Sequence, residues 1–175
     1  MKFFIAAGSN INPEDMLKRA AGALSQRLCI RQASTFYRNA PVGMLPDTPD
    51  FINGMFVGET DRLPVEIWRI LRCIEDKYGR IRSTSKYISR TLDLDLILYG
   101  DWVLNTRELT IPDRDIGERE FLSVPLAELD PGIGIPGMPG TIQDIVPEHH
   151  SMIPLPRLTA EIRAQIDINR RIHEH

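Results

Sequence analysis

Two aspartates, Asp93 and Asp95, are the residues best suited to chemistry in this chain, and they lie in the segment TLDLDLILY, residues 91–99. Polar and apolar residues alternate there, which is typical of a β-strand with one face on a core. Both carboxylates then project from the other face, roughly 6–7 Å apart along the strand. Two carboxylates this close repel each other unless a cation lies between them, and Mg²⁺ prefers oxygen ligands. The pair therefore predicts a magnesium site that binds nucleotide phosphates. The alternative is a strand face exposed to solvent that carries two acidic residues. The apolar residues of the run should all face the core: Leu92, Leu94, Leu96 and Leu98.

A basic segment, GRIRSTSKYISR at residues 79–90, comes directly before this strand and contains no acidic residue. Its cations are Arg80, Arg82, Lys86 and Arg90, and its small polar centre indicates a loop. Guanidinium groups bind phosphate oxygens in bidentate fashion. On its own the loop would be ordinary charged surface, but next to the carboxylate pair it favours a site for magnesium and a polyphosphate.

The composition limits the class of protein. With 175 residues, 42% of them hydrophobic, the chain is long enough for one domain with a proper core. A net charge of −3 gives no electrostatic case for nucleic acid or an anionic membrane as a partner. No apolar run approaches a membrane span, and the short run after Lys2 does not indicate a signal peptide. We therefore expect a cytoplasmic protein with small-molecule substrates, a monomer or, through its C-terminal segment, a dimer.

The cysteines and histidines suggest no metal or disulfide framework. Cys29 and Cys73 lie in apolar segments, so both are expected to be buried thiols. The histidines at positions 149, 150, 173 and 175 have tail-like surroundings and are expected to be exposed to solvent.

The elements that must position the aspartates follow the order strand, helix, strand, strand, helix, strand. This order predicts an α+β fold, a ferredoxin-like antiparallel sheet with helices packed against one face. A catalytic domain is expected over residues 1–150, followed by a C-terminal extension, residues 151–175, with a helix. The expected segments are strands over residues 2–7, 29–38, 51–59 and 91–99, helices over 13–28, 64–78, 118–129 and 159–172, and a long loop over 39–50.

Four motifs in register resemble the 6-hydroxymethyl-7,8-dihydropterin pyrophosphokinase family of the folate pathway. They are RTLDLDLILYG (residues 90–100), AAGSN (6–10), FYRNAPVG (36–43) and PDFING (49–54), and the similarity runs from about Lys2 to about Ile145. The resemblance implies that ATP donates its pyrophosphoryl group to the pterin hydroxymethyl oxygen and leaves as AMP. It also implies two Mg²⁺ ions, held by Asp93 and Asp95.

The resemblance further assigns roles to residues of this sequence. Phe51 and Phe121 would stack on the pterin ring and Asn53 would bind its edge; without the resemblance both phenylalanines would be ordinary core residues. The resemblance assigns catalytic roles to Arg80 and Arg90 in addition to the two aspartates. The residues that would bind ATP are Arg72, Glu75, Arg82, Arg90, Ile97, Asp113 and Arg119. The remaining residues that would bind the pterin are Asn39, Val42, Gly43 and Tyr87.

Several positions depart from the family pattern. Asp113 stands where a histidine is usual and would repel ATP unless a metal or Arg114 offsets its charge. Ile88 and Ser89 replace the usual Gly-Pro. These departures keep open a diverged paralogue that binds pterin or nucleotide with weak or altered transfer. In a nucleotidyltransferase palm the Gly-Ser turn lies close before the aspartates, whereas here more than eighty residues separate Gly8-Ser9 from Asp93, so that class fits poorly. An interaction module without activity is the remaining alternative.

Overall fold

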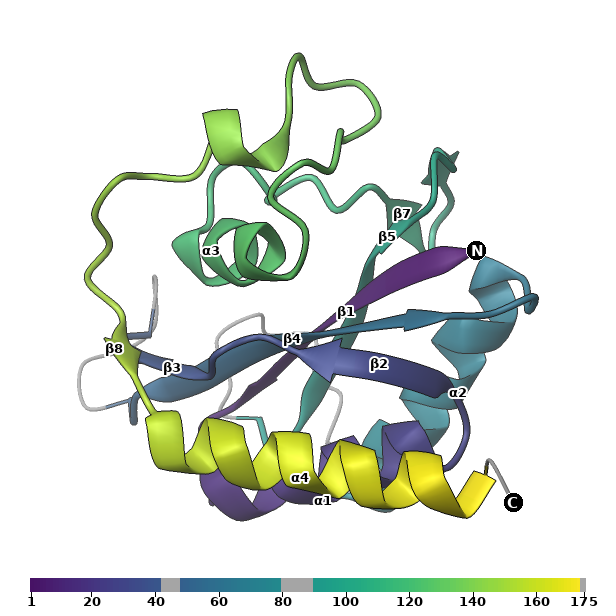
Figure 1. Cartoon of the computed structure of the whole chain (residues 1–175), viewed down its shortest axis with the longest axis vertical. Helices are drawn as coiled ribbons and strands as arrows, with labels where there is room; N and C mark the ends of the chain where they lie inside the picture. The colour runs from purple at the N-terminus through teal and green to yellow at the C-terminus, as the bar shows by residue number, and fades with distance from the viewer. Residues whose placement is uncertain (42–47, 80–89, 174–175) are drawn as a thin grey trace.

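The structure, a computed structural model, describes residues 1–41, 48–79 and 90–173. A sheet with strand order β5-β1-β4-β3-β8 runs through the molecule, β2 also pairs with β4, and the pairings are antiparallel (Figure 1). This is the predicted ferredoxin-like α+β arrangement. The elements are β1 (Lys2–Ser9), α1 (Pro13–Ser25), β2 (Cys29–Ala33), β3 (Tyr37–Asn39), β4 (Phe51–Glu59), α2 (Pro64–Lys77), β5 (Asp93–Tyr99), β6 (Leu104–Asn105), β7 (Thr110–Ile111), α3 (Glu120–Leu129), a 3-10 turn (Ile142–Asp144), β8 (Ile153–Pro154) and α4 (Pro156–His173).

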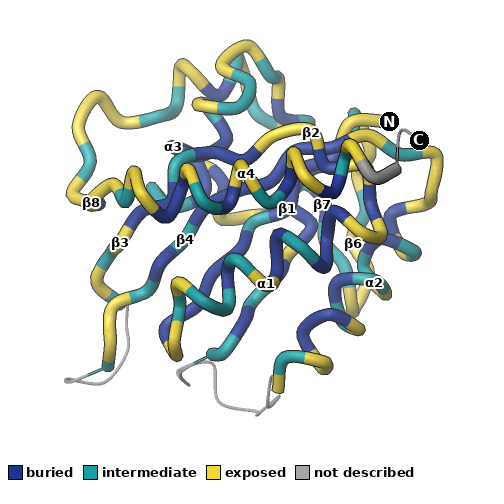
Figure 2. The backbone as a smooth tube through the Cα atoms, turned by 60° about the horizontal axis from the view of Figure 1, so that its bottom comes forward, coloured by how far each residue is buried: buried dark blue, intermediate teal, exposed yellow. Residues whose placement is uncertain are grey.

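The sheet is covered on both faces. Alternate residues of β1 enter two cores: Phe3 and Ile5 pack with α1, α2 and α4, whereas Phe4 packs with α3 residues such as Leu122 and Leu126. In Figure 1, α3 accordingly lies across the sheet from α1 and α4, and Figure 2 shows the inward-facing turns buried and the outer turns exposed. The prediction that helices pack on the sheet is confirmed, but their restriction to one face was wrong for α3.

The first two helices follow from their sequences. Proline stands in the first turn of each, where its missing N–H has no intrahelical acceptor. Helix α2 ends at Lys77, and Gly79 follows its C-cap residue Tyr78 with a φ of +76°, which suits glycine. The buried stripes are Leu17, Ala20, Ala21 and Leu24 on α1 and Ile67, Leu71 and Ile74 on α2.

Two strands differ from expectation. The predicted strand 29–38 is split into β2 and β3, which pair with opposite halves of β4. In β5 the register against β1 shifts at a bulge, so Leu96 pairs with Ile5 and Leu98 with Phe4. Because an extra residue reverses the alternation, Leu98 packs in the core on the α3 side. Leu92, Leu94 and Leu96 pack in the other core, so the prediction that all four leucines share one core was wrong for Leu98.

The C-terminal helix begins three residues before the expected Thr159 and packs on its own chain. Its Leu158, Ile162 and Ile166 are buried in the core that α1 and β2 share. Lys18 of α1 forms an ion pair with Glu161 (3.0 Å). The division of the chain at residue 150 stays a prediction.

Smaller expectations also fail. Cys29 and Cys73 are exposed because both fall on the outward faces of their elements. His149 is exposed, but His150 is half-buried with its ring edge-on to Tyr37 at 5.2 Å between centroids. The side chains of His173 and His175 lie outside the described residues. Among the described residues, no helix is long and apolar enough to cross a membrane.

Candidate active site

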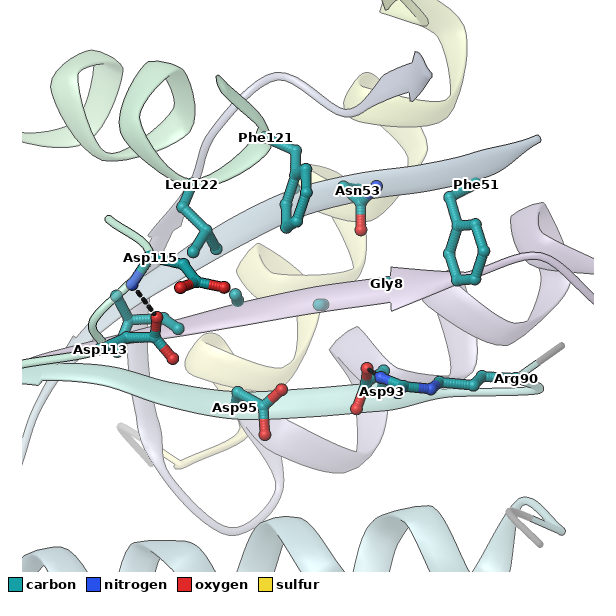
Figure 3. Close-up of a pocket in the computed structure, with 14 residues that line it drawn as sticks. Gly8, Phe51, Asn53, Arg90, Asp93, Asp95, Asp113, Asp115, Phe121 and Leu122 are labelled. Atoms are coloured by element: carbon teal, nitrogen blue, oxygen red, sulfur yellow. Dashed lines mark hydrogen bonds and ion pairs between the residues drawn. The ribbon is translucent and has the colours of Figure 1, made fainter. Parts of the chain in front are cut away.

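Asp93 and Asp95 lie on one face of β5 and line a cavity of about 220 Å³ (Figure 3). Their side chains differ in exposure, 15% for Asp93 and 53% for Asp95. The alternation of β5 places the leucine between them, Leu94, in the opposite core. The predicted geometry of the carboxylate pair is therefore present, and the pair opens on a cavity rather than on bulk solvent alone. The cavity lining comprises Ala6, Ala7, Gly8, Phe51, Asn53, Gly54, Arg90, Asp93, Asp95, Ile97, Asp113, Asp115, Phe121 and Leu122.

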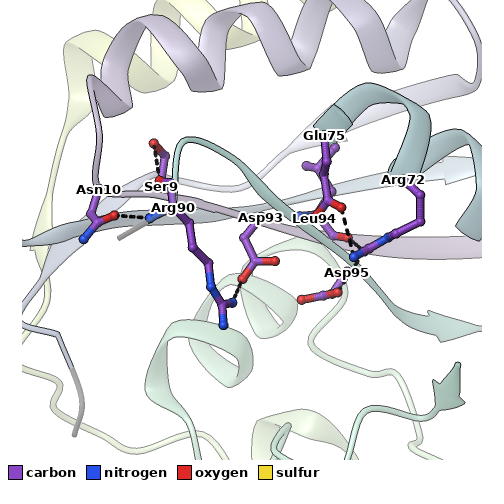
Figure 4. A network of polar contacts seen from close by, with 8 residues as sticks. All are labelled: Ser9, Asn10, Arg72, Glu75, Arg90, Asp93, Leu94 and Asp95. Atoms are coloured by element: carbon purple, nitrogen blue, oxygen red, sulfur yellow. Dashed lines mark hydrogen bonds and ion pairs between the residues drawn. The ribbon is translucent and has the colours of Figure 1, made fainter. Parts of the chain in front are cut away.

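Arg90 is held beside Asp93 by the residues at the end of β1. The Asn10 Oδ1 accepts a hydrogen bond from the Arg90 N–H (2.6 Å), and the Asn10 N–H donates to the Arg90 carbonyl (3.1 Å). The Ser9 hydroxyl donates to the Thr91 carbonyl (2.6 Å). The guanidinium of Arg90 forms an ion pair with Asp93 (Figure 4). Ser9 and Asn10 thus fix the chain where it enters β5.

Asp95 is supported from α2. Arg72 forms ion pairs with Asp95 (3.0 Å) and with Glu75 (2.9 Å), and it also donates to the Leu94 carbonyl. Glu75 is fully buried, and its Oε1 accepts a hydrogen bond from the Leu94 N–H (2.8 Å). Charge-assisted bonds of this kind are the stronger ones in proteins. Arg72 and Glu75, predicted as ATP ligands, therefore lie behind the carboxylate pair rather than along the cavity (Figure 4).

A second pair of carboxylates, Asp113 and Asp115, lines the cavity beside β5, where the Asp113 N–H donates to the Ile97 carbonyl (2.9 Å). Asp113 Oδ1 accepts a hydrogen bond from the Asp115 N–H (2.8 Å). Burial raises the pKa of Asp113, and the charge of Asp115 adds to the rise, while that hydrogen bond and Arg114 act against it. Arg114 itself donates to Asn105 (2.8 Å), and Arg119 pairs with Asp115 at 3.5 Å. Arg119 thus reaches the edge of the site through Asp115.

Two aromatic rings and an amide form the other wall. Phe51 and Phe121 stand on either side of Asn53 (Figure 3). Asn53 Nδ2 donates to Asn39 Oδ1 (2.6 Å), which leaves the Asn53 carbonyl oxygen turned toward Gly8. A Cβ at Gly8 would stand 2.5 Å from that oxygen, so glycine makes room for the amide. A flat heterocycle with an amide edge suits such a wall.

The structure brings together much of the predicted site. Eight predicted residues line the cavity: Phe51, Asn53, Arg90, Asp93, Asp95, Ile97, Asp113 and Phe121. Asn39, Arg72 and Arg119 contact lining residues from outside it. Glu75 reaches the lining only through Arg72, which pairs with Asp95. Predicted residues Val42, Gly43, Arg80, Arg82 and Tyr87 lie outside the described residues. The lining residues without a predicted role are Ala6, Ala7, Gly8, Gly54, Asp115 and Leu122, and Ser9 and Asn10 support the site from outside the cavity. The spacing of Asp113 and Asp115 repeats that of the first pair and could have identified Asp115.

The charge of the lining decides what it can bind. Among the described residues that line the cavity, four are carboxylates and one, Arg90, is a cation. A polyphosphate would be repelled there unless divalent cations or further arginines accompany it. The aspartates stand as two pairs, and the described residues hold no group of three or more metal-binding side chains. A metal site here would therefore need oxygen ligands from a substrate or solvent, as Mg²⁺ commonly has.

Comparisons with known proteins point to one family. A family model described as 7,8-dihydro-6-hydroxymethylpterin-pyrophosphokinase (HPPK) matches residues 4–131. The chain is 38% identical over 136 residues to the 2-amino-4-hydroxy-6-hydroxymethyldihydropteridine pyrophosphokinase of Haemophilus influenzae, covering 76% of this chain and 84% of that protein. It is 39% identical over 132 residues to the protein of the same name from Synechocystis sp., covering 73% of this chain and 65% of that protein.

Solved structures share the fold at low identity. Wild-type HPPK-DHPS from Plasmodium falciparum superposes with a TM-score of 0.65 and 12% identity, covering 82% of this chain. The same protein with pteroate gives a TM-score of 0.66 and 13% identity, covering 96% of this chain. The chain spans less than half the length of those solved chains, 44% in each case. On the sequence matches, the chain belongs to the 7,8-dihydro-6-hydroxymethylpterin pyrophosphokinase family.

Proposed function

We propose that the protein transfers the pyrophosphoryl group of ATP to the hydroxymethyl oxygen of 6-hydroxymethyl-7,8-dihydropterin. The pterin oxygen forms a bond to the β-phosphorus, the bond from that phosphorus to the oxygen bridging to the α-phosphate breaks, and AMP leaves. The hydroxyl proton passes to solvent. The observation that carries the proposal is a single cavity in which the Asp93–Asp95 pair faces an aromatic and amide wall.

Asp93 and Asp95 would hold Mg²⁺, and we propose two ions. The donor set fits, because both residues offer hard carboxylate oxygens from one strand face. Bound Mg²⁺ would offset the charge of the phosphates and of the departing AMP. Arg72 fixes the position of Asp95, and Arg90 fixes that of Asp93. The two carboxylates are therefore held in place before any ligand arrives.

The pterin would lie between Phe51 and Phe121 with its edge on Asn53. The rings supply stacking and the amide supplies one donor and one acceptor. Phosphates would then extend toward Asp93 and Asp95, which places the hydroxymethyl oxygen near the β-phosphorus. Arg119 at the rim and the undescribed Arg80 and Arg82 complete the proposed ATP site, with Val42, Gly43 and Tyr87 beside the pterin.

A second candidate function is a diverged paralogue that binds pterin with weak or altered transfer. The half-buried Asp113 on the cavity wall favours it, since a carboxylate there repels phosphate. The rate separates the two: turnover far below the roughly 1–1000 per second that is typical of enzymes, with normal pterin binding, supports the paralogue. The apolar face of α4 packs on its own core, which favours a monomer over a dimer through the extension.

The proposal is tested by product analysis. Purified protein is incubated with Mg²⁺, ATP and the reduced pterin, and nucleotides are separated by chromatography. We expect AMP and pterin diphosphate in equal amounts. ADP or free pyrophosphate as the main product would exclude the proposal, as would no consumption of ATP.

A further inference from the structure

The C-terminal extension binds one short stretch of the chain, residues 33–38, at several successive points. The Thr159 hydroxyl accepts a hydrogen bond from the buried Phe36 N–H (2.9 Å) and donates to the Leu155 carbonyl (2.9 Å). The Leu155 N–H donates to the Phe36 carbonyl (2.9 Å). Arg163 Nε donates to the Ala33 carbonyl (3.0 Å). Both backbone polar groups of Phe36 therefore depend on the extension.

The same contacts lead directly into β3. Strand β8 pairs with Tyr37 and Arg38, so β3 lies between β8 and β4 instead of forming the edge of the sheet (Figure 1). On its other side β3 is in register with β4, and Asn39 stands opposite Phe51. A strand paired on both sides is held more firmly in register than an edge strand. The extension thus fixes the strand that carries Asn39.

Asn39 in turn sets the direction of Asn53. Its Oδ1 accepts from Asn53 Nδ2 at 2.6 Å, and the Asn53 oxygen consequently faces Gly8 and the cavity (Figure 3). An amide that could rotate freely would exchange donor for acceptor at that point. Asn53 therefore presents one defined edge to a ligand because β3 is in place.

A small core connects the extension with the aromatic wall as well. Met152 packs with Tyr37 and with Val124 of α3, and Phe121 packs against this cluster. The Tyr37 hydroxyl donates to Glu128 of α3. Helix α3, which carries Phe121 in its first turn, is thereby joined to β3 and to the chain that precedes β8.

We propose that the extension positions the pterin-binding wall, and that Thr159 is the positioning residue at its centre. The family match ends at residue 131, so this arrangement belongs to a part of the chain that the match does not cover. The inference rests on the proposed function for the identity of the ligand. It requires that loss of the Thr159–Phe36 bond weakens pterin binding selectively, because in the proposed function ATP would lie on the side of Asp93 and Asp95.

The test compares Thr159→Val, which keeps the shape but removes the hydroxyl, with Thr159→Ser, which keeps the hydroxyl. We expect Thr159→Val to raise the KM for pterin about three- to tenfold, as expected for loss of one buried hydrogen bond. The KM for ATP and kcat should stay within about twofold, and Thr159→Ser should restore the pterin KM. Ile166→Val is the matched control, because it removes a buried methyl group from α4 beyond these contacts. It should lower stability without a selective effect on pterin.

Two results would overturn the inference: equal changes in the KM values for pterin and ATP, or a pterin effect of Ile166→Val as large as that of Thr159→Val. If Thr159→Val does not fold, the exposed Arg163→Gln provides the same comparison through the Ala33 bond. If the parent protein forms no AMP, the proposed function fails by itself. The inference is then decided by NMR: the Asn53 side-chain amide signals must shift in Thr159→Val and not in Ile166→Val.

Discussion

The buried carboxylate of Glu75 accepts a hydrogen bond from the backbone N–H of Leu94, the residue between the two aspartates of β5 (2.8 Å). Helix α2 therefore holds the strand segment that carries the carboxylate pair. Arg72 completes this connection, since it pairs with both Glu75 and Asp95. The proposed metal site is prearranged by residues that do not line the cavity.

This support should be visible in the free energy of unfolding. Glu75→Ala leaves Arg72 and the Leu94 N–H without their buried partner, so we expect a loss of about 3 kcal/mol. Glu75→Gln keeps a carbonyl oxygen for the Leu94 N–H and should lose less. Urea unfolding followed by circular dichroism measures both. Equal losses below about 0.5 kcal/mol would show that Glu75 does not support the strand.

The carboxylate pair should be essential for turnover and not for folding. Asp95→Asn keeps the size of the side chain but removes the charge that binds Mg²⁺, so kcat/KM should fall about a hundredfold or more. The Mg²⁺ concentration for half-maximal rate should rise. Asp101→Asn, an exposed aspartate in the turn after β5, is the control and should keep the parent rate. A small loss shared by both variants would argue against a metal role.

Stacking by Phe121 predicts a selective effect on the pterin. Phe121→Leu keeps an apolar side chain but removes the π-face, which is worth about 0.5–1.5 kcal/mol in aromatic pairs. The KM for pterin should therefore rise about two- to tenfold with the KM for ATP unchanged. Steady-state kinetics with each substrate varied in turn provide the measurement. A change confined to ATP would place the pterin elsewhere.

Asp113 predicts a particular dependence of stability on pH. Burial raises the pKa of Asp113, so the folded state takes up this proton more readily than the unfolded chain. Above the pKa of the folded state, the buried charged carboxylate therefore lowers the free energy of unfolding. This destabilisation is relieved as the pH falls through the pKa of the folded state and Asp113 takes up its proton. Asp113→Asn should be more stable than the parent at pH 8, and the difference should shrink on acidification. Urea midpoints across pH 8 to 4 measure it; a difference that grows in acid would reverse the sign.

The sequence predicted the features that depend on local pattern. The alternation around Asp93 and Asp95 specified a strand face, and the apolar stripes of α1 and α2 specified helices. The extra residue in β5 could not be predicted, because a bulge depends on pairing with β1 rather than on the residues of β5 alone. For this reason the prediction that Leu98 shares a core with Leu92, Leu94 and Leu96 was wrong.

Features that join distant parts of the chain were missed for the same reason. Ser9 and Asn10 hold the residues before β5 across some eighty positions of sequence, which no local pattern records. The sequence alone does not show that Glu75 is buried, because its position on α2 is also compatible with a solvated helix face. Its burial follows from the packing of α2 on β5, where Glu75 pairs with Arg72 and accepts a hydrogen bond from the Leu94 N–H. Burial of a charged group is decided by tertiary packing and not by propensity.

A crystal structure with Mg²⁺, a non-hydrolysable ATP analogue and the reduced pterin tests the central claim most directly. We predict oxygen atoms of both Asp93 and Asp95 at about 2.0–2.1 Å from Mg²⁺ that also binds phosphate oxygens. The pterin should lie between Phe51 and Phe121. Phosphates bound in the cavity with neither aspartate contacting a cation would contradict the account.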